Sequence, residues 1–285
     1  MKNLDVASFS GKRVLIRVDF NVPLNDNFNI TDDSRILAAV PTIKMVAGGG
    51  GKVILMSHLG RPKNGPENSF SLKHIVNHLS KVLETTVAFS DNCIGETTLT
   101  TANNLQEGDV LLLENLRFHA EEKMGDISFA KQLSDLADIY INDAFGAAHR
   151  SHASTSTIAQ FFPENKYFGL LLEKEIYNLD LVLKNPQKPF TAIIGGSKIT
   201  GKIEVITALL NKVDNLIIGG GMAYTFVKAM GGNIGNSLIE EDKISLAEQL
   251  IGLAKSKGVD LLLPSDSVNV KAFDNSADTN VSDIE

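Results

Sequence analysis

The sequence predicts an α/β protein made of two doubly wound parallel-sheet domains of the Rossmann-like type, joined by a helix. Three observations support this fold class. Short apolar runs recur along the chain, amphipathic helical segments separate them, and one long helical segment divides the chain beyond its middle. Strand and helix in alternation are typical of a parallel sheet that is covered by helices on both faces.

The expected strands are short runs of β-branched and aliphatic residues, a composition that favours strands buried on both faces. In the first half of the chain these runs are Val14–Phe20, Val53–Met56, Val110–Leu113 and Ile139–Ile141. In the second half they are Thr191–Ile194, Asn215–Ile218 and Val259–Leu263. Each half therefore contains enough strands for a sheet of its own.

The helix expected over Ser71–Leu83 shows the helical pattern most clearly. Its apolar residues fall on one stripe at helical spacing: Leu72, Ile75, Val76, Leu79, Val82 and Leu83. A serine, Ser69 or Ser71, can cap its first turn. We expect this stripe to pack against the first sheet.

A second helix is expected over Tyr167–Lys184, ended by Asn185 and Pro186. All six arginines precede it, whereas the chain after it uses only lysine as a permanent cation. This change in composition favours a domain boundary. We therefore expect a first domain over residues 1–166, a linking helix over 167–185 and a second domain over 186–285.

Composition limits the classes of partner. The chain has 285 residues, 43% of them hydrophobic, with a formal net charge of −7 and a pI near 5.4. This indicates a globular protein without nucleic acid or an anionic membrane as its main partner. Cys93 is the only cysteine, which excludes an intrachain disulfide and favours a buried thiol in a reducing compartment. Without a signal-peptide core or a membrane-length apolar run, we expect a cytoplasmic protein.

Polar and cationic residues follow the strands of the first half. In a doubly wound sheet, ligands bind at the carboxyl ends of the strands. The residues expected there are Asp19, Asn21, His58, Arg61, Arg117, Asp143, His149 and Arg150, and Arg35 follows an acidic turn at an expected helix start. Guanidinium groups match the oxygens of phosphate and carboxylate, so the pattern predicts a site for a small phosphorylated acid.

A single arginine is more often a solvated surface charge, and only the repeated placement at strand ends favours a site. Arg13 and Arg17 lie within or beside a strand, which favours a structural role for both. His74 and His78, and likewise His149 and His152, have spacings that can hold a metal. We expect no metal at either pair, because the first faces solvent and the second has Arg150 between its members.

Glycine turns follow two strands of the second half, at Gly195–Lys198 and at Gly219–Met222. Glycine allows backbone amides to approach phosphate oxygens, and the N-terminus of a following helix favours negative charge. These turns predict nucleotide binding. Gly196–Lys202 fits the spacing of a P-loop, but Ile203 stands where a P-loop needs Ser or Thr. The Gly219–Gly221 run also lacks the spacing of a dinucleotide fingerprint.

Six blocks of sequence together resemble the phosphoglycerate kinase family. They are Arg17–Pro23, Ser57–Pro62, Leu113–Phe118, Asn142–Arg150, Gly195–Lys198 and Gly219–Tyr224. Their order and spacing also agree with the family. The resemblance implies reversible phosphoryl transfer between 1,3-bisphosphoglycerate and ADP, which gives 3-phosphoglycerate and ATP.

The resemblance also implies residue roles. Asp19, Asn21, Arg35, His58, Arg61, Arg117 and Arg150 would bind 3-phosphoglycerate. Gly196, Lys198, Lys202, Gly219, Gly220 and Leu238 would bind the nucleotide. Arg35 and Lys198 would act in catalysis by meeting the phosphoryl group in the transition state. Gly201 and Ser197 depart from residues that the family often has at these positions, and neither change removes a charged group.

The chain ends at Glu285, before the segment with which the family would continue. The resemblance therefore implies that the second domain is incomplete and that the protein ligand of Mg²⁺ lies outside this sequence. It also implies a monomer. Two alternatives remain: a chain that binds 3-phosphoglycerate without catalysis, and a P-loop ATPase that depends on Lys202 but not on Arg35.

Overall fold

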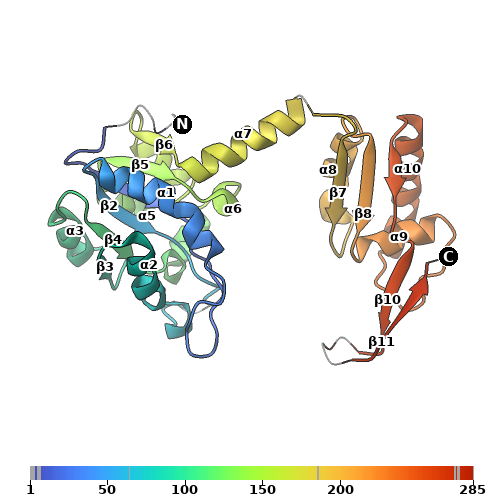
Figure 1. The fold of residues 1–285 in the computed structure, drawn as a ribbon, viewed down its shortest axis with the longest axis horizontal. Coiled ribbons are helices and arrows are strands. Elements are labelled where there is room, and N and C mark those ends of the chain that lie inside the picture. Colours follow the sequence, from blue (N-terminus) through green and yellow to red (C-terminus); the bar gives the residue numbers. More distant parts are fainter. Residues whose placement is uncertain are drawn as a thin grey trace. The chain divides into compact units, whose positions relative to one another are not determined.

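The computed structural model describes residue 4 and residues 8–63, 65–184, 186–272, 274 and 277–284. Asn185, the expected last residue of the linking segment, and the outermost residues of both expected domains lie outside this range. The chain forms two compact units, Met1–Leu179 and Asp180–Glu285 (Figure 1). Among the described residues, no helix is both long and apolar enough to cross a membrane.

The first unit is built on a six-stranded sheet with the order β3-β4-β2-β1-β5-β6, and all neighbouring strands are parallel. The strands are β1 (Arg13–Arg17), β2 (Lys52–Met56), β3 (Val87–Ser90), β4 (Val110–Leu113), β5 (Ile139–Asn142) and β6 (Lys166–Phe168). Of these, β3 and β6 were not expected from the sequence. Both are edge strands, where partial exposure weakens the apolar signal.

Helices cover both faces of this sheet. They are α1 (Ser34–Gly48), α2 (Val76–Leu83), α3 (Glu96–Asn103), α4 (Ala120–Met124), α5 (Ile127–Ser134) and α6 (Phe145–Ala148). Successive strand residues point to opposite faces. Val14 and Ile16 accordingly join one core with Ile36 of α1, while Leu15 joins a second core with Phe129 of α5. These two cores confirm the doubly wound architecture.

The expected linking helix begins later than predicted. Residues 166–168 form β6, in which Tyr167 pairs with Ile141, and the helix α7 covers Leu170–Lys184. Its start is determined by buried acceptors from the first unit. Thr42 Oγ1 accepts from the Leu170 amide at 3.0 Å, and Asp143 Oδ1 accepts from the amides of Leu171 and Leu172 at 2.9 and 3.1 Å.

The second unit contains a three-stranded parallel sheet with the order β7-β8-β9 and an antiparallel pair of strands. Its elements are β7 (Thr191–Gly195), α8 (Ile203–Leu209), β8 (Asn215–Gly219), α9 (Met222–Ala229), α10 (Ile244–Ser256), β9 (Asp260–Leu262), β10 (Asp266–Val270) and β11 (Thr279–Asp283). Ile194, Leu216 and Ile218 form a core with residues of the three helices. The neighbouring Ile193 is 74% exposed, so β7 is not buried on both faces as expected.

Candidate functional site

The cationic residues of the first unit lie beyond the carboxyl ends of its central strands. Asp19 and Asn21 follow β1, His58 and Arg61 follow β2, and Arg117 follows β4 in the short 3-10 helix Leu116–Phe118. Arg150 follows α6, and Arg35 lies in the first turn of α1. Because the strands are parallel, these positions share one edge of the sheet.

His58 shows that the predicted cluster forms. Its side chain is buried, and burial together with the positive charges of Arg17, Arg117, Arg150 and Arg35 lowers its pKa to about 2. Burial likewise lowers the pKa of Arg117, and the charges of Arg150, Arg17 and Arg61 add to this shift. The four arginines expected at the site, Arg35, Arg61, Arg117 and Arg150, therefore share one electrostatic neighbourhood.

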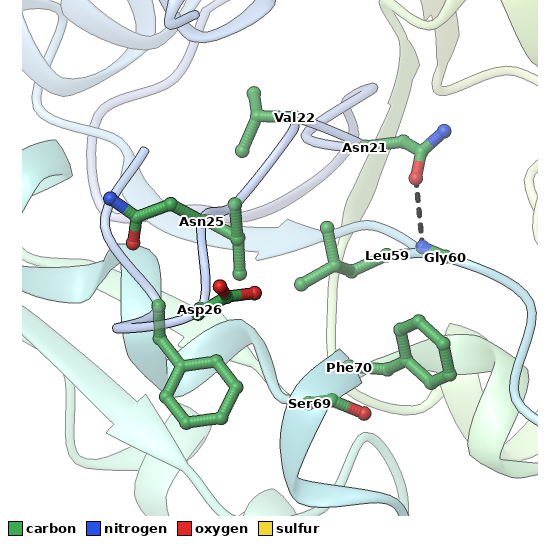
Figure 2. A pocket seen from close by; sticks show the side chains of 10 residues that line it. Asn21, Val22, Asn25, Asp26, Leu59, Gly60, Ser69 and Phe70 are labelled. Atoms are coloured by element: carbon green, nitrogen blue, oxygen red, sulfur yellow. Dashed lines mark hydrogen bonds between the residues drawn. The ribbon is translucent and has the colours of Figure 1, made fainter. Parts of the chain in front are cut away.

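Hydrogen bonds hold part of this cluster in place. Arg35 Nη1 donates to Asp19 Oδ2 at 2.9 Å. The backbone of Gly60 is held at both of its polar atoms, because its N–H donates to Asn21 Oδ1 and its carbonyl accepts from Arg117 Nη1, both at 2.8 Å. Figure 2 shows the bond between Asn21 and Gly60.

Other donors of the cluster are unused. Arg117 Nε is buried and has no hydrogen-bond partner. Arg61 and Arg150 are exposed, and neither side chain forms a hydrogen bond or ion pair within the described part of the chain. A group of free guanidinium donors around a neutral imidazole is suited to a small ligand with several anionic oxygens.

Sequence reasoning did not assign a role to Asn115, whose side chain bonds the backbone of the loops that carry the cluster. Its side chain is fully buried and donates to the carbonyls of Leu59 and Phe70 at 2.7 and 2.9 Å. Its Oδ1 accepts from the Arg117 amide at 3.0 Å. A polar residue two positions after a fully buried strand is the signal that could have identified it, since a buried polar side chain needs partners.

A cavity of about 400 Å³ lies beside Gly60 (Figure 2). Five of its ten lining residues have apolar side chains, namely Val22, Leu24, Phe28, Leu59 and Phe70. Asn21 and Gly60 belong both to this wall and to the hydrogen bonds of the arginine cluster. Asn21 and Gly60 therefore connect the wall of the cavity to the arginine cluster.

The glycine turns of the second unit come together at the ends of β7 and β8. A Cβ atom added to Gly220, whose φ is +70°, would lie 2.9 Å from the amide nitrogen of Gly196. A Cβ atom on Gly196 would lie 3.2 Å from Lys202 Nζ. Gly195 and Gly219 are direct partners in the ladder between β7 and β8. These contacts bring Gly196, Lys202, Gly219 and Gly220 into one place.

The remaining two residues of the expected nucleotide site lie close by. Leu238 is 55% exposed and would contact a Cβ atom on Gly221 at 3.4 Å. Lys198 is exposed, and its charge helps to lower the pKa of Glu240. Only glycine at position 220 allows the close approach of the two turns. The approach is supported by the Met222 amide at the start of α9, which donates to the Gly196 carbonyl at 2.8 Å.

The described residues do not by themselves form a magnesium site. No group of three His, Cys, Asp or Glu side chains within them could hold a metal ion. The acidic side chain beside the turns, Glu240, already accepts hydrogen bonds from Thr200 Oγ1 at 2.7 Å and from the Ile199 amide. His74 and His78 also have protein partners, the carbonyl of Asn68 and Asp33 Oδ2.

Comparisons with known proteins agree on one family. The sequence model described as "Phosphoglycerate kinase" matches residues 3–285. The chain is 50% identical to the phosphoglycerate kinase of Chlorobium phaeobacteroides, covering 98% of this chain and 70% of that protein. It is 51% identical to that of Prochlorococcus marinus, covering 100% of this chain and 71% of that protein.

Solved structures give the same result. The phosphoglycerate kinase structure from Coxiella burnetii has a TM-score of 0.81 and 38% identity, covering 99% of this chain and 70% of that one. The structure from Pyrococcus horikoshii has a TM-score of 0.84 and 28% identity, covering 99% and 71%.

Proposed function

This chain belongs to the phosphoglycerate kinase family, a family of phosphotransferases, and from that membership we propose which of its residues perform the reaction. The phosphoryl group leaves the acyl phosphate of 1,3-bisphosphoglycerate and joins the terminal phosphate of ADP. The products are 3-phosphoglycerate and ATP, and the reaction is reversible.

The first unit binds the three-carbon acid in this proposal. The observation that carries it is the convergence of Arg35, Arg117 and Arg150 on the surroundings of His58, with Arg61 close enough to Arg117 to lower its pKa. These guanidinium groups bind the phosphate and carboxylate oxygens in pairs. Asp19 orients Arg35 through their ion pair, and Asn21 holds the loop at Gly60.

The second unit binds the nucleotide. Gly196, Gly219 and Gly220 present backbone amides to the phosphates, and Lys198 and Lys202 supply positive charge. The exposed side chain of Leu238, beside Gly221, offers an apolar contact for the nucleoside.

Phosphoryl transfer requires little covalent assistance from a protein, so alignment and charge stabilisation dominate the catalysis. We assign Arg35 and Lys198 to the oxygens of the transferred phosphoryl group. No general base is needed, because the carboxylate that accepts the phosphoryl group in the direction of 1,3-bisphosphoglycerate formation is already ionised. Mg²⁺ enters this proposal only as the partner of the nucleotide phosphates.

Replacing Arg35 or Lys198 with alanine tests the catalytic assignment. Each loss removes a charge that stabilises the transition state, and we expect turnover to fall about 10²- to 10³-fold in a coupled assay. Calorimetry with 3-phosphoglycerate and with ATP is run in parallel. An unchanged rate in both variants would refute the roles. Binding of 3-phosphoglycerate without turnover would indicate a chain that only binds the acid. ATP hydrolysis at the same rate in the Arg35 variant would indicate an ATPase.

We further propose that residues 1–166 form the acid-binding domain, that 167–185 link the domains and that 186–285 form the nucleotide-binding part. The division into two compact units near residue 180 supports two binding parts. A cytoplasmic location is supported by the 54% identity to a relative from Arabidopsis thaliana named "Phosphoglycerate kinase 3, cytosolic". A monomer and the absence of nucleic-acid partners are proposed as well, and light scattering tests the former.

A further inference from the structure

Arg17 lies at the end of β1 and is the largest side chain in the fully buried core, with 1% of its surface exposed. All of its described hydrogen bonds go to the protein. Its Nε donates to Ser154 Oγ at 3.0 Å, its Nη1 donates to the carbonyl of Val18, and its Nη2 lies 3.1 Å from His58 Nδ1. The guanidinium therefore contacts the arginine cluster through His58.

The positive charge of Arg17 is balanced by the carboxylate of Glu122. Glu122 is fully buried, and its Oε1 accepts from Ser154 Oγ at 2.6 Å while its Oε2 accepts from the Ser154 amide at 3.0 Å. Burial alone would raise the pKa of Glu122, but hydrogen bonds from His152 and Ser154 and the charge of Arg17 lower it. Glu122, Ser154, Arg17 and His58 thus form one connected chain of polar groups.

The chemistry of guanidinium decides which tautomer His58 adopts. Arginine has only N–H donors and no acceptor, so a hydrogen bond from Nη2 requires an unprotonated Nδ1. A neutral imidazole with an unprotonated Nδ1 carries its proton on Nε2. The competing acceptor, Asp19 Oδ1, is 3.9 Å from Nδ1, which is too long for a hydrogen bond.

We propose that Arg17 is a positioning residue that holds His58 as the neutral Nε2–H tautomer, so that the imidazole donates one uncharged hydrogen bond into the arginine cluster. His58 Nε2 has no partner among the described residues, and the N–H is therefore available to an anionic ligand. The site gains a donor without adding another positive charge among the arginines. This use of the donor rests on the proposed binding of 3-phosphoglycerate, whereas the tautomer itself does not.

Nitrogen-15 NMR of the whole chain, labelled at histidine and free of ligand, tests the tautomer. The six imidazoles are distinguished by the loss of one set of signals in His58→Asn. We expect a pyridine-like shift for Nδ1 of His58 and a pyrrole-like shift for Nε2 near neutral pH. A protonated Nδ1, or an equal mixture of tautomers, in the unmodified chain would overturn the proposal without any variant of Arg17.

Arg17→Met then tests the cause, and Arg13→Met is the matched control because Arg13 lies at the other end of β1 and pairs with Asp138. We expect the proton of His58 to shift toward Nδ1 in Arg17→Met only. The dissociation constant for 3-phosphoglycerate should rise about tenfold, since one hydrogen bond to an anion is lost. An unchanged tautomer in a folded Arg17→Met chain contradicts the inference. If that variant does not fold, Ser154→Ala, which removes the acceptor of Arg17 Nε, replaces it with the same expected direction.

The two proposals fail differently. If the Nε2–H tautomer is present but 3-phosphoglycerate leaves the His58 signals unchanged, then the assignment of the acid site is wrong and the role of Arg17 stands. If the acid shifts these signals but Nδ1 carries the proton, then the assignment of the acid site stands and the role of Arg17 is wrong.

Discussion

Arg17 and Arg117 show how burial separates the functions of arginines in one cluster. The guanidinium nitrogens of Arg17 bond to other groups of the protein, such as Ser154 and His58, whereas Arg117 has a buried Nε without a partner. An unsatisfied buried donor is costly, and a ligand oxygen placed there would remove the cost. The sequence distinguished the two residues, because Arg17 falls within or beside an expected strand and Arg117 follows one. It could not show the partners of Arg17, Ser154 and His58, because they are distant in sequence.

Arg117→Ala should weaken the binding of 3-phosphoglycerate about 10- to 100-fold, because hydrogen bonds to a charged group are lost. Calorimetry with the acid gives the dissociation constant. Arg13→Ala removes an arginine of the same unit that pairs with Asp138, outside the cluster, and should leave that constant unchanged. Equal effects in the two variants would show that net charge, and not the cluster, determines affinity.

His58 should make the folded state sensitive to acid. Its pKa is about 2 in the folded state against 6.5 for the free side chain, because of burial and the facing arginines. Since the unfolded chain takes up this proton first, stability is lost as the pH falls below about 6.5, by up to about 1.4 kcal/mol per pH unit. The charged groups that face His58 are Arg17, Asp19, Arg35, Arg117 and Arg150.

Thermal unfolding of the chain and of His58→Asn, followed between about pH 4 and pH 7, measures this effect. Asparagine has no titrating group, and its Oδ1 can still accept from Arg17. The unfolding midpoint of the variant should therefore fall less steeply with decreasing pH than that of the unmodified chain. If the unfolding midpoints of the two proteins fall equally steeply with decreasing pH, then His58 is not the cause of the acid sensitivity.

At the scale of elements, the central strands were predictable and several boundaries were not, since β1 ends at Arg17 and not at Phe20 as expected. Four of the six strands of the first sheet were expected, because their buried apolar runs give a strong signal. The start of α7 was missed by three residues, since Tyr167 reads equally well in a helix or in an edge strand. Tertiary partners, namely Ile141 in the sheet and Asp143 at the helix start, decide between these possibilities.

The contact between the two glycine turns can be tested with a pair of substitutions. Gly220→Ala places a Cβ atom 2.9 Å from the Gly196 amide nitrogen at a positive φ, and should cost about 1–3 kcal/mol of stability and abolish measurable nucleotide binding. Gly201→Ala is the control, because a Cβ atom there meets nothing within 4 Å. Thermal unfolding and calorimetry with ATP compare the two. Loss of binding in both variants would show that the turn contact is not the cause.

At the scale of the whole molecule, the two units have separate hydrophobic cores. The two cores of the first unit lie on either face of its sheet, and the third core belongs entirely to the second unit. The two-part organisation was expected from the loss of arginine beyond residue 150 together with one long helix. The exposed face of the second sheet was not expected, because an apolar run does not reveal which of its faces will be covered.

Separate cores imply that a ligand of one unit stabilises that unit alone. At about 100 times its dissociation constant, 3-phosphoglycerate should stabilise the first unit by about 2.7 kcal/mol. Hydrogen exchange followed by mass spectrometry should show slower exchange in β1 and β2 and no change in β8. Equal slowing in β8 would mean that both units unfold as one.

The backbone of Gly60, which bonds Asn21 through its N–H and Arg117 through its carbonyl, has a consequence for enzyme engineering. The ring of Phe70 packs so closely on Gly60 that a Cβ atom there would come within 2.2 Å of it. A smaller residue at position 70 would loosen the backbone at Gly60 and change the orientation of the Arg117 guanidinium without replacing any charged group. Libraries that seek a new acid specificity can therefore be built from the apolar side of the loop.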